Sequence, residues 1–120
     1  MRIAVTSTGP DMTSEVDPRF GRATYFVVVD GETGEFTPQD NGQNLNAAQG
    51  AGIQAAQNVA ALGVETVLTG NVGPKAFAAL QAGGIEVYTG ASGSVKDAIE
   101  QFQAGRLERA SQSNVEGHWM

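Results

Sequence analysis

Cysteine is absent from this chain of 120 residues, and histidine and tryptophan occur once each. Without cysteine the chain can form no disulfide framework, thiolate zinc site, ordinary cysteine-ligated iron–sulfur cluster or thiol nucleophile. The single histidine, His118, lies close to the carboxyl end, where a lone histidine is usually solvated. The H-x-E, H-E-x-x-H and G-x-S-x-G patterns are also missing. We therefore predict no catalytic residue and no metal ligand supplied by the protein.

Positive charge is scarce as well. Seven basic side chains stand against 13 acidic ones, which gives a net charge of −6 and a pI near 4.5. A protein that binds duplex DNA needs a basic face to displace counterions, so we expect no nucleic-acid partner. No apolar run approaches the roughly 20 residues that cross a bilayer, and the run Ile3-Ala4-Val5 is too short for a signal peptide. We expect a cytoplasmic protein that does not associate with membranes.

Glycine is the residue in excess, with 16 positions. An apolar share of 41% and a charged share of 17% are ordinary for one globular domain. Apolar and β-branched runs bounded by glycine or proline predict five strands, at residues 2–7, 24–29, 35–40, 66–69 and 85–88. Apolar positions at three- and four-residue spacing predict three helices, between Gly50 and Leu62, between Pro74 and Ala82, and between Ser94 and Ala104.

A hairpin followed by alternating strands and helices is typical of the α/β class. The Asp30-Gly31 turn makes one edge of the sheet antiparallel, and right-handed crossovers make the other edge parallel. We predict a five-stranded mixed sheet in the order 3-2-1-4-5 with helices packed on it. Residues 1–109 are predicted to form a single domain and residues 110–120 a loose carboxyl-terminal tail, because few apolar positions follow residue 107.

Three small polar loops follow strands at the edge of the sheet where ligands of open α/β folds bind. They span residues 6–10, 70–74 and 89–94. Glycine lets a ligand approach main-chain amides closely, and the unpaired amides at a helix start favour anions. Lys75 and Lys96 lie at the starts of the two helices that follow. The loops together predict an anion site, although each alone is also typical of a tight turn.

Between the first two strands, Arg19, Phe20 and Arg22 lie close together in the sequence. Arginine binds oxyanions through a planar fork of N–H donors, and a phenyl ring can shield one face of a ligand from water. The alternative is that one of the arginines pairs with Asp17 or Glu15. Because this segment connects two adjacent strands, it can fold over the three loops.

The candidate binding residues are the polar, basic and glycine positions of these loops together with the phenyl ring: Thr8, Arg19, Phe20, Arg22, Asn71, Gly73, Lys75, Ser92, Gly93 and Ser94. The spacing of a dinucleotide fingerprint and that of a Walker loop are both missing. A phosphorylated small molecule, bound or turned over at the same loops, stays open as an alternative. No general base or nucleophile is evident for such an enzyme.

Several motifs are weak singly and specific in combination. They are Asp17-Pro18-Arg19-Phe20-Gly21-Arg22-Ala23 followed by Tyr25-Phe26 and Asp30, then Gly50-Ala51-Gly52-Ile53, Gly73-Pro74-Lys75-Ala76, Gly84-Ile85-Glu86-Val87-Tyr88 and Gly105-Arg106-Leu107. In order and spacing, from residue 1 to about residue 109, the chain resembles the dinitrogenase iron–molybdenum cofactor biosynthesis family. The resemblance implies a ribonuclease H-like three-layer fold without nuclease chemistry, and a role in carrying or assembling metal–sulfur clusters.

Within the family, the resemblance is to stand-alone domains that carry a molybdenum–copper sulfide cluster without covalent attachment. Some relatives supply a histidine or cysteine near the segment that holds Arg19, Phe20 and Arg22 as a cluster ligand, and this segment has neither. The resemblance thus implies a non-enzymatic carrier of an anionic cluster whose own sulfides complete the metal coordination. Arg19, Arg22 and Lys75 would neutralise its charge, and Asn71, Gly73 and residues 92–94 would donate hydrogen bonds. We expect a monomer, and an adaptor that docks on a cluster-handling ATPase is a further alternative.

Overall fold

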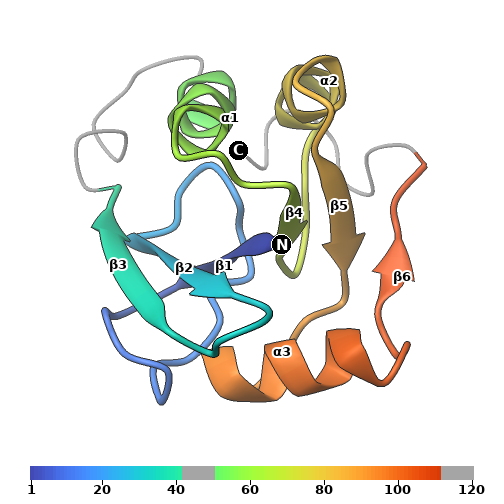
Figure 1. Ribbon diagram of the computed structural model, residues 1–120. Coiled ribbons are helices and arrows are strands. Elements are labelled where there is room, and N and C mark those ends of the chain that lie inside the picture. The colour runs from blue at the N-terminus through green and yellow to red at the C-terminus, as the bar shows by residue number, and fades with distance from the viewer. Residues whose placement is uncertain (42–50, 112–120) are drawn as a thin grey trace.

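The chain folds into three layers, with a mixed sheet between helices (Figure 1). The computed structural model describes residues 1–41 and 51–111. The strands are β1 (Arg2–Ser7), β2 (Tyr25–Asp30), β3 (Phe36–Asp40), β4 (Thr66–Leu68), β5 (Glu86–Thr89) and β6 (Glu108–Arg109). The helices are α1 (Ala51–Ala61), α2 (Pro74–Ala82) and α3 (Val95–Gln103). Each predicted strand and helix is present, with ends close to the predicted ones.

The sheet has the strand order β3-β2-β1-β4-β5-β6. β1 lies at its centre, antiparallel to β2, where Ala4 is opposite Val28, and parallel to β4, where Ala4 is opposite Val67. β5 pairs parallel with β4 and continues that half of the sheet. The α/β class and the predicted order 3-2-1-4-5 are confirmed, and the structure adds β6 at the far edge.

α1 and α2 cover one face of the sheet, and α3 covers the other (Figure 1). Side chains alternate between the two faces along β1. Ala4 belongs to the apolar cluster under α1 and α2, whereas Ile3 and Val5 belong to the cluster under α3. Because both faces of the central strands are buried, β1 and β2 have continuous apolar runs and not an alternating pattern.

The sixth strand lies where the sequence predicts the end of the domain. Glu108 and Arg109 pair antiparallel with β5, and the Ala110 N–H donates to the Val87 carbonyl at 2.8 Å. Leu107, just before the strand, packs against the cluster under α3. Both residues of β6 are charged and exposed, so no apolar pattern marks this strand in the sequence.

The predicted tail, residues 110–120, is therefore tied to the sheet at its first residue. Its remainder from residue 112, with His118, lies outside the described residues, as does Gly50 at the predicted start of the first helix. Within residues 1–41 and 51–111, no helix combines the length and the apolar content needed to cross a membrane.

Candidate functional site

The loop of residues 8–22 connects β1 to β2 and lies across the carboxyl ends of the parallel strands; it is called the basic loop after its Arg19 and Arg22. It is fixed to β1 by two hydrogen bonds between one pair of residues. The Asp17 N–H donates to the Thr6 carbonyl at 2.9 Å, and the Thr6 hydroxyl donates to the Asp17 carbonyl at 2.7 Å. The Thr6 hydroxyl also lies 2.9 Å from the hydroxyl of Thr69, which follows β4. The loop thus folds over the strand ends, as the sequence predicts.

Arg19 lies beside the loop that leads into α2. The Asn71 N–H donates to the Pro18 carbonyl at 2.7 Å. The Phe20 N–H donates to the Asn71 carbonyl at 3.3 Å, so that Arg19 and Asn71 form a short parallel bridge. The Phe20 side chain is 2% exposed, with its ring centroid 5.4 Å from that of Phe26. Phe20 therefore anchors the loop from the core and does not form the expected wall over a ligand, whereas the Arg19 side chain is exposed.

Gly70 allows this close approach between the two loops. A Cβ atom at Gly70 would lie 2.9 Å from both the Cα atom and the carbonyl oxygen of Pro18. These are main-chain atoms of a loop that is hydrogen-bonded on both sides, so they cannot move aside cheaply. The φ angle of Gly70 is not positive, which means that the requirement is for space alone.

The amino end of α2 has no side-chain cap. Gly73 occupies the N-cap position, and Pro74, the first helical residue, has no N–H to satisfy. The first main-chain bond runs from the Phe77 N–H to the Gly73 carbonyl at 2.9 Å. Within the described ranges, the N–H groups of Lys75 and Ala76 donate to no protein acceptor. Ala76 is fully buried, whereas Lys75 is exposed. The Lys75 N–H, the positive end of the helix dipole and the Lys75 ammonium are thus available to an anion.

The amino end of α3 is capped, in contrast. The Asp97 N–H donates to the Ser94 hydroxyl, and the Ser94 N–H donates to the Asp97 carboxylate, each at 3.0 Å. The Asp97 carboxylate interacts with the Ser94 N–H and, to a smaller extent, with the Ser94 side chain, and these hydrogen bonds hold the pKa of Asp97 below its ordinary value of 3.8. Ser94, which the sequence predicts as a hydrogen-bond donor to the ligand, has its N–H and its hydroxyl oxygen engaged in the cap.

The two remaining amides of this helix start donate to the basic loop. The Val95 N–H donates to the Ser14 carbonyl at 2.8 Å, and the Lys96 N–H donates to the Met12 carbonyl at 2.9 Å. Every N–H in the first turn of α3 therefore has a protein partner. An anion at this end would meet the carboxylate of Asp97 and no free N–H from the first turn of the helix.

The other predicted residues have different surroundings. Thr8 is exposed, and its hydroxyl donates to the Glu15 carbonyl at 3.2 Å. Ser92 is exposed, and its N–H and carbonyl face the side-chain amide of Gln101 at 3.4 and 3.0 Å. Arg22 is half-buried.

The structure brings Arg19 and Asn71 together at the entrance to α2, where Gly73 and Lys75 follow. Residues 92–94 lead instead into α3, on the other face of the sheet (Figure 1). The candidate site is therefore narrower than the sequence predicts, and it is centred on the start of α2.

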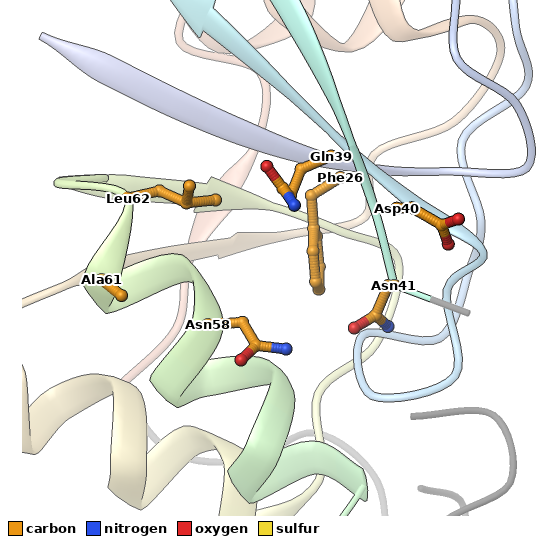
Figure 2. A pocket seen from close by; sticks show the side chains of 7 residues that line it. All are labelled: Phe26, Gln39, Asp40, Asn41, Asn58, Ala61 and Leu62. Carbon is orange, nitrogen blue, oxygen red and sulfur yellow. The ribbon is translucent and has the colours of Figure 1, made fainter. Parts of the chain in front are cut away.

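A cavity of about 370 Å³ lies elsewhere, between the antiparallel edge of the sheet and α1 (Figure 2). It is lined by Phe26, Gln39, Asp40, Asn41, Asn58, Ala61 and Leu62. The Phe26 ring points from the sheet toward α1 (Figure 2). Among the residues that the structure describes, no predicted site residue lines this cavity, and the one charged lining side chain is the carboxylate of Asp40. This cavity is therefore not suited to an anion.

Two residues that hold the site together were not predicted from the sequence. Asp17 fixes the basic loop to β1, and Gly70 gives that loop room beside β4. Asp17 lies next to Pro18, a pairing typical of a turn, and it begins the motif of residues 17–23, but neither signal shows that it bonds to Thr6. The need for glycine at position 70 arises from a residue that is distant in the sequence, so no local pattern shows it.

Metal ligands are not part of the arrangement. Among the residues that the structure describes, no group of three or more His, Cys, Asp or Glu side chains could hold a metal ion. The donors at the start of α2 are N–H groups and cationic side chains, which bind anions.

Known proteins with the same fold and related sequences identify the family. A family model described as dinitrogenase iron–molybdenum cofactor matches residues 1–105. The apo form of the orange protein from Desulfovibrio gigas is 48% identical, with a TM-score of 0.93, and the match covers 95% of this chain and 96% of that one. A putative NifB protein from Thermotoga is 39% identical, with a TM-score of 0.84 and coverage of 97% and 98%. An uncharacterised protein of Methanocaldococcus jannaschii is 32% identical over 111 residues, 91% of each chain. The chain belongs to the dinitrogenase iron–molybdenum cofactor family.

Proposed function

We propose that this chain is a non-enzymatic carrier that holds an anionic metal–sulfur cluster, a molybdenum–copper sulfide, without covalent attachment. The observation that carries the proposal is the uncapped start of α2, where the exposed Lys75, with its ammonium and an N–H that has no acceptor among the described residues, lies next to the loop that presents Arg19. The bound cluster is the cargo of the protein and not a catalytic cofactor.

The chemistry of the donors supports an anion that keeps its own metal ligands. Main-chain N–H groups, a guanidinium and an ammonium can all interact with sulfide or oxide atoms on the surface of a cluster. The described residues offer no cluster of metal-ligating side chains, and the chain has no cysteine. Molybdenum and copper would therefore stay coordinated by the sulfides that arrive with them.

The charge of the molecule supports a small anion over a polyanion. The net charge is −6, so a long nucleic acid would be repelled by most of the surface. The positive groups at the start of α2 act over a short range, because salt screens exposed charges beyond about 8–10 Å. A compact anion can lie within that range.

The relatives support a carrier role. The family is described by a cofactor, and the orange protein structure at 48% identity is that of an apo form. That relative therefore has a state in which a ligand is bound. The fold and length of this chain match those of the orange protein almost throughout, so the same kind of binding is proposed here.

A phosphorylated small molecule is the second candidate for the same groups. Uncapped helix starts bind phosphoryl oxygens through the same amides and dipole that would bind a sulfide cluster. The start of α2 is therefore an equally suitable place for a phosphate, and the experiment must separate the two anions.

The proposal is tested by mixing the purified chain with tetrathiomolybdate and a copper salt, and by desalting the mixture before recording its visible absorption. We expect a coloured protein fraction with molybdenum and copper in a fixed ratio by elemental analysis. Parallel samples receive orthomolybdate with copper, or a panel of phosphorylated metabolites followed by thermal unfolding, since a bound ligand raises stability by mass action.

A folded chain that is colourless after desalting would overturn the cluster proposal. If a phosphorylated compound raises the unfolding temperature while tetrathiomolybdate with copper does not, the second candidate replaces the first. Circular dichroism of each sample shows that the chain is folded throughout.

A further inference from the structure

Asp17 is a buried carboxylate at the edge of a site that is proposed to bind an anion. Only 7% of the surface of Asp17 is exposed to solvent. A buried carboxylate is costly unless it is hydrogen-bonded, and a negative charge beside an anion weakens binding. A carboxylate in this place therefore needs a structural reason.

The hydrogen bonds of Asp17 give that reason. Its carboxylate Oδ1 accepts from the main-chain N–H of Arg19 at 3.0 Å, in the pattern of a turn that begins with an aspartate. Its own N–H and carbonyl both bond to Thr6 at the end of β1. Asp17 thus connects the end of a central strand directly to the backbone of Arg19.

Arg19 is held from its other side as well. The neighbouring Pro18 carbonyl and Phe20 N–H are both paired with Asn71, and the Phe20 ring lies in the core. The Arg19 backbone is thus fixed by groups before and after it, while its side chain extends into solvent. Pre-organisation of this kind lowers the entropy that is lost when a ligand is bound.

We infer that Asp17 is a positioning residue for the anion site: its buried carboxylate fixes the backbone of Arg19, so that the guanidinium is presented beside the start of α2. This inference rests on the proposed function and identifies a residue that acts on the ligand only through Arg19. The role is geometric, because a carboxamide oxygen at position 17 can accept the same hydrogen bond. Asp17→Asn should therefore preserve the site, and Asp17→Ala should not.

The first test needs no ligand. Hydrogen exchange of the Arg19 amide is measured by NMR in the wild-type chain, in Asp17→Asn and in Asp17→Ala. We expect slow exchange in the first two and exchange faster by about tenfold or more in Asp17→Ala, because the amide has lost its acceptor. The Asn71 amide, which bonds to Pro18, serves as an internal reference for the fold of the loop.

The second test measures binding of tetrathiomolybdate with copper in a double-mutant cycle. Asp17→Ala should lower the affinity about five- to tenfold in the wild-type background and leave it unchanged in an Arg19→Ala background, since the effect passes through Arg19. Asp17→Asn should bind as tightly as the wild-type chain, or more tightly because a negative charge is gone. If Asp17→Ala does not fold, Asp17→Ser takes its place, with a weaker acceptor and a smaller expected loss.

The outcomes separate the inference from the function on which it rests. Absence of binding by the wild-type chain would overturn the proposed function. Equal Arg19 exchange in the wild-type chain and in Asp17→Ala would overturn the role of Asp17, whatever the binding result. An equal loss of affinity in both backgrounds of the cycle would show a general structural effect and would also overturn it.

Discussion

The starts of α2 and α3 have the same kind of sequence and opposite chemistry. Each helix follows a glycine-containing loop at the carboxyl end of a parallel strand, and each has lysine as its second residue, Lys75 or Lys96. The start of α2 has Gly73 at the N-cap and Pro74 as its first residue. The start of α3 has Ser94 at the N-cap and Asp97 three residues later. As a result, α2 keeps free amides and α3 has none.

The difference shows that a glycine-rich loop before a helix does not by itself make an anion site. The amides must also be left without an internal acceptor. At α3 the capping box satisfies the N–H groups of Ser94 and Asp97. The N–H groups of the two residues between them donate to the carbonyls of Ser14 and Met12. The basic loop of residues 8–22 therefore has two roles: it closes the start of α3 and it presents Arg19 at the start of α2.

The largest predicted effect comes from removing the positive side chains at the open end. The double variant Arg19→Ala with Lys75→Ala should lower the affinity for tetrathiomolybdate with copper about a hundredfold, since each charge-assisted contact contributes roughly tenfold. Lys96→Ala, the matched change at the closed end, should alter it less than about twofold. Titration followed by visible absorption gives the three affinities. An equal loss in Lys96→Ala would break the distinction between the two helix starts.

The next effect concerns the fit of the basic loop against β4. Gly70→Ala should lower the free energy of unfolding by about 1–3 kcal/mol, because the new methyl group meets the backbone of Pro18. Gly83→Ala is the control: the φ of Gly83 is −85°, and a Cβ there would lie no closer than 3.5 Å to its nearest neighbour, the Leu80 carbonyl oxygen. It should change the same quantity by less than about 1 kcal/mol. Urea unfolding measures the free energy of unfolding of both variants. Equal values would show that the loop moves aside at little energetic cost, and would contradict the prediction.

Removal of the α3 cap should affect stability without affecting binding. Ser94→Ala is expected to cost about 1 kcal/mol of unfolding free energy, and Ser94→Gly only a few tenths, as for other N-cap residues. The affinity for the cluster should stay within about twofold of the wild-type value in both variants. A tenfold weaker affinity would mean that the closed end takes part in binding after all.

The smallest effect is the pH dependence of the same cap. The pKa of Asp97 is lowered in the folded chain by its hydrogen bonds to Ser94, so the stability that it contributes is fully present above the unfolded value of 3.8. This contribution is lost as the pH falls through the folded pKa. Asp97→Asn should therefore flatten the fall of unfolding free energy with acid in that range, as measured by urea unfolding at several pH values. The carboxylate of Asp30 has its pKa lowered mainly by the Glu32 and Thr33 amides, and it serves as a second, independent case.

Most of the fold follows from local patterns. The apolar runs of β1 and β2, the Asp30-Gly31 turn and the proline at the start of α2 are all visible in the sequence, and they predict the elements and their order. β6 could not be predicted, because its two residues are charged and it is held by main-chain bonds to β5. A strand of this kind can be recognised only from the structure, where its main chain pairs with the neighbouring strand.

The site was only partly predictable, for a related reason. The residue types at Arg19, Asn71 and Lys75 indicate an anion site, but the sequence cannot show which amides already have acceptors. The carbonyl of Ser14, which closes α3, and the ring of Phe20, which enters the core, act through tertiary contacts. Such contacts decide whether a donor is free, and neither spacing nor composition records them.

The hydrogen bonds of the basic loop also set the order in which the loop and its partners can fold together. Thr6 and Thr69, whose hydroxyls are hydrogen-bonded, are 63 residues apart in the chain. The Ser14 and Met12 carbonyls of the loop accept hydrogen bonds from the amides of residues 95 and 96. During synthesis the loop emerges early, while its partners emerge near the end of the domain. Arg19 itself gains its fixed place only after Asn71 has emerged, and the first half of the chain has Arg19 without the helix start that completes the site.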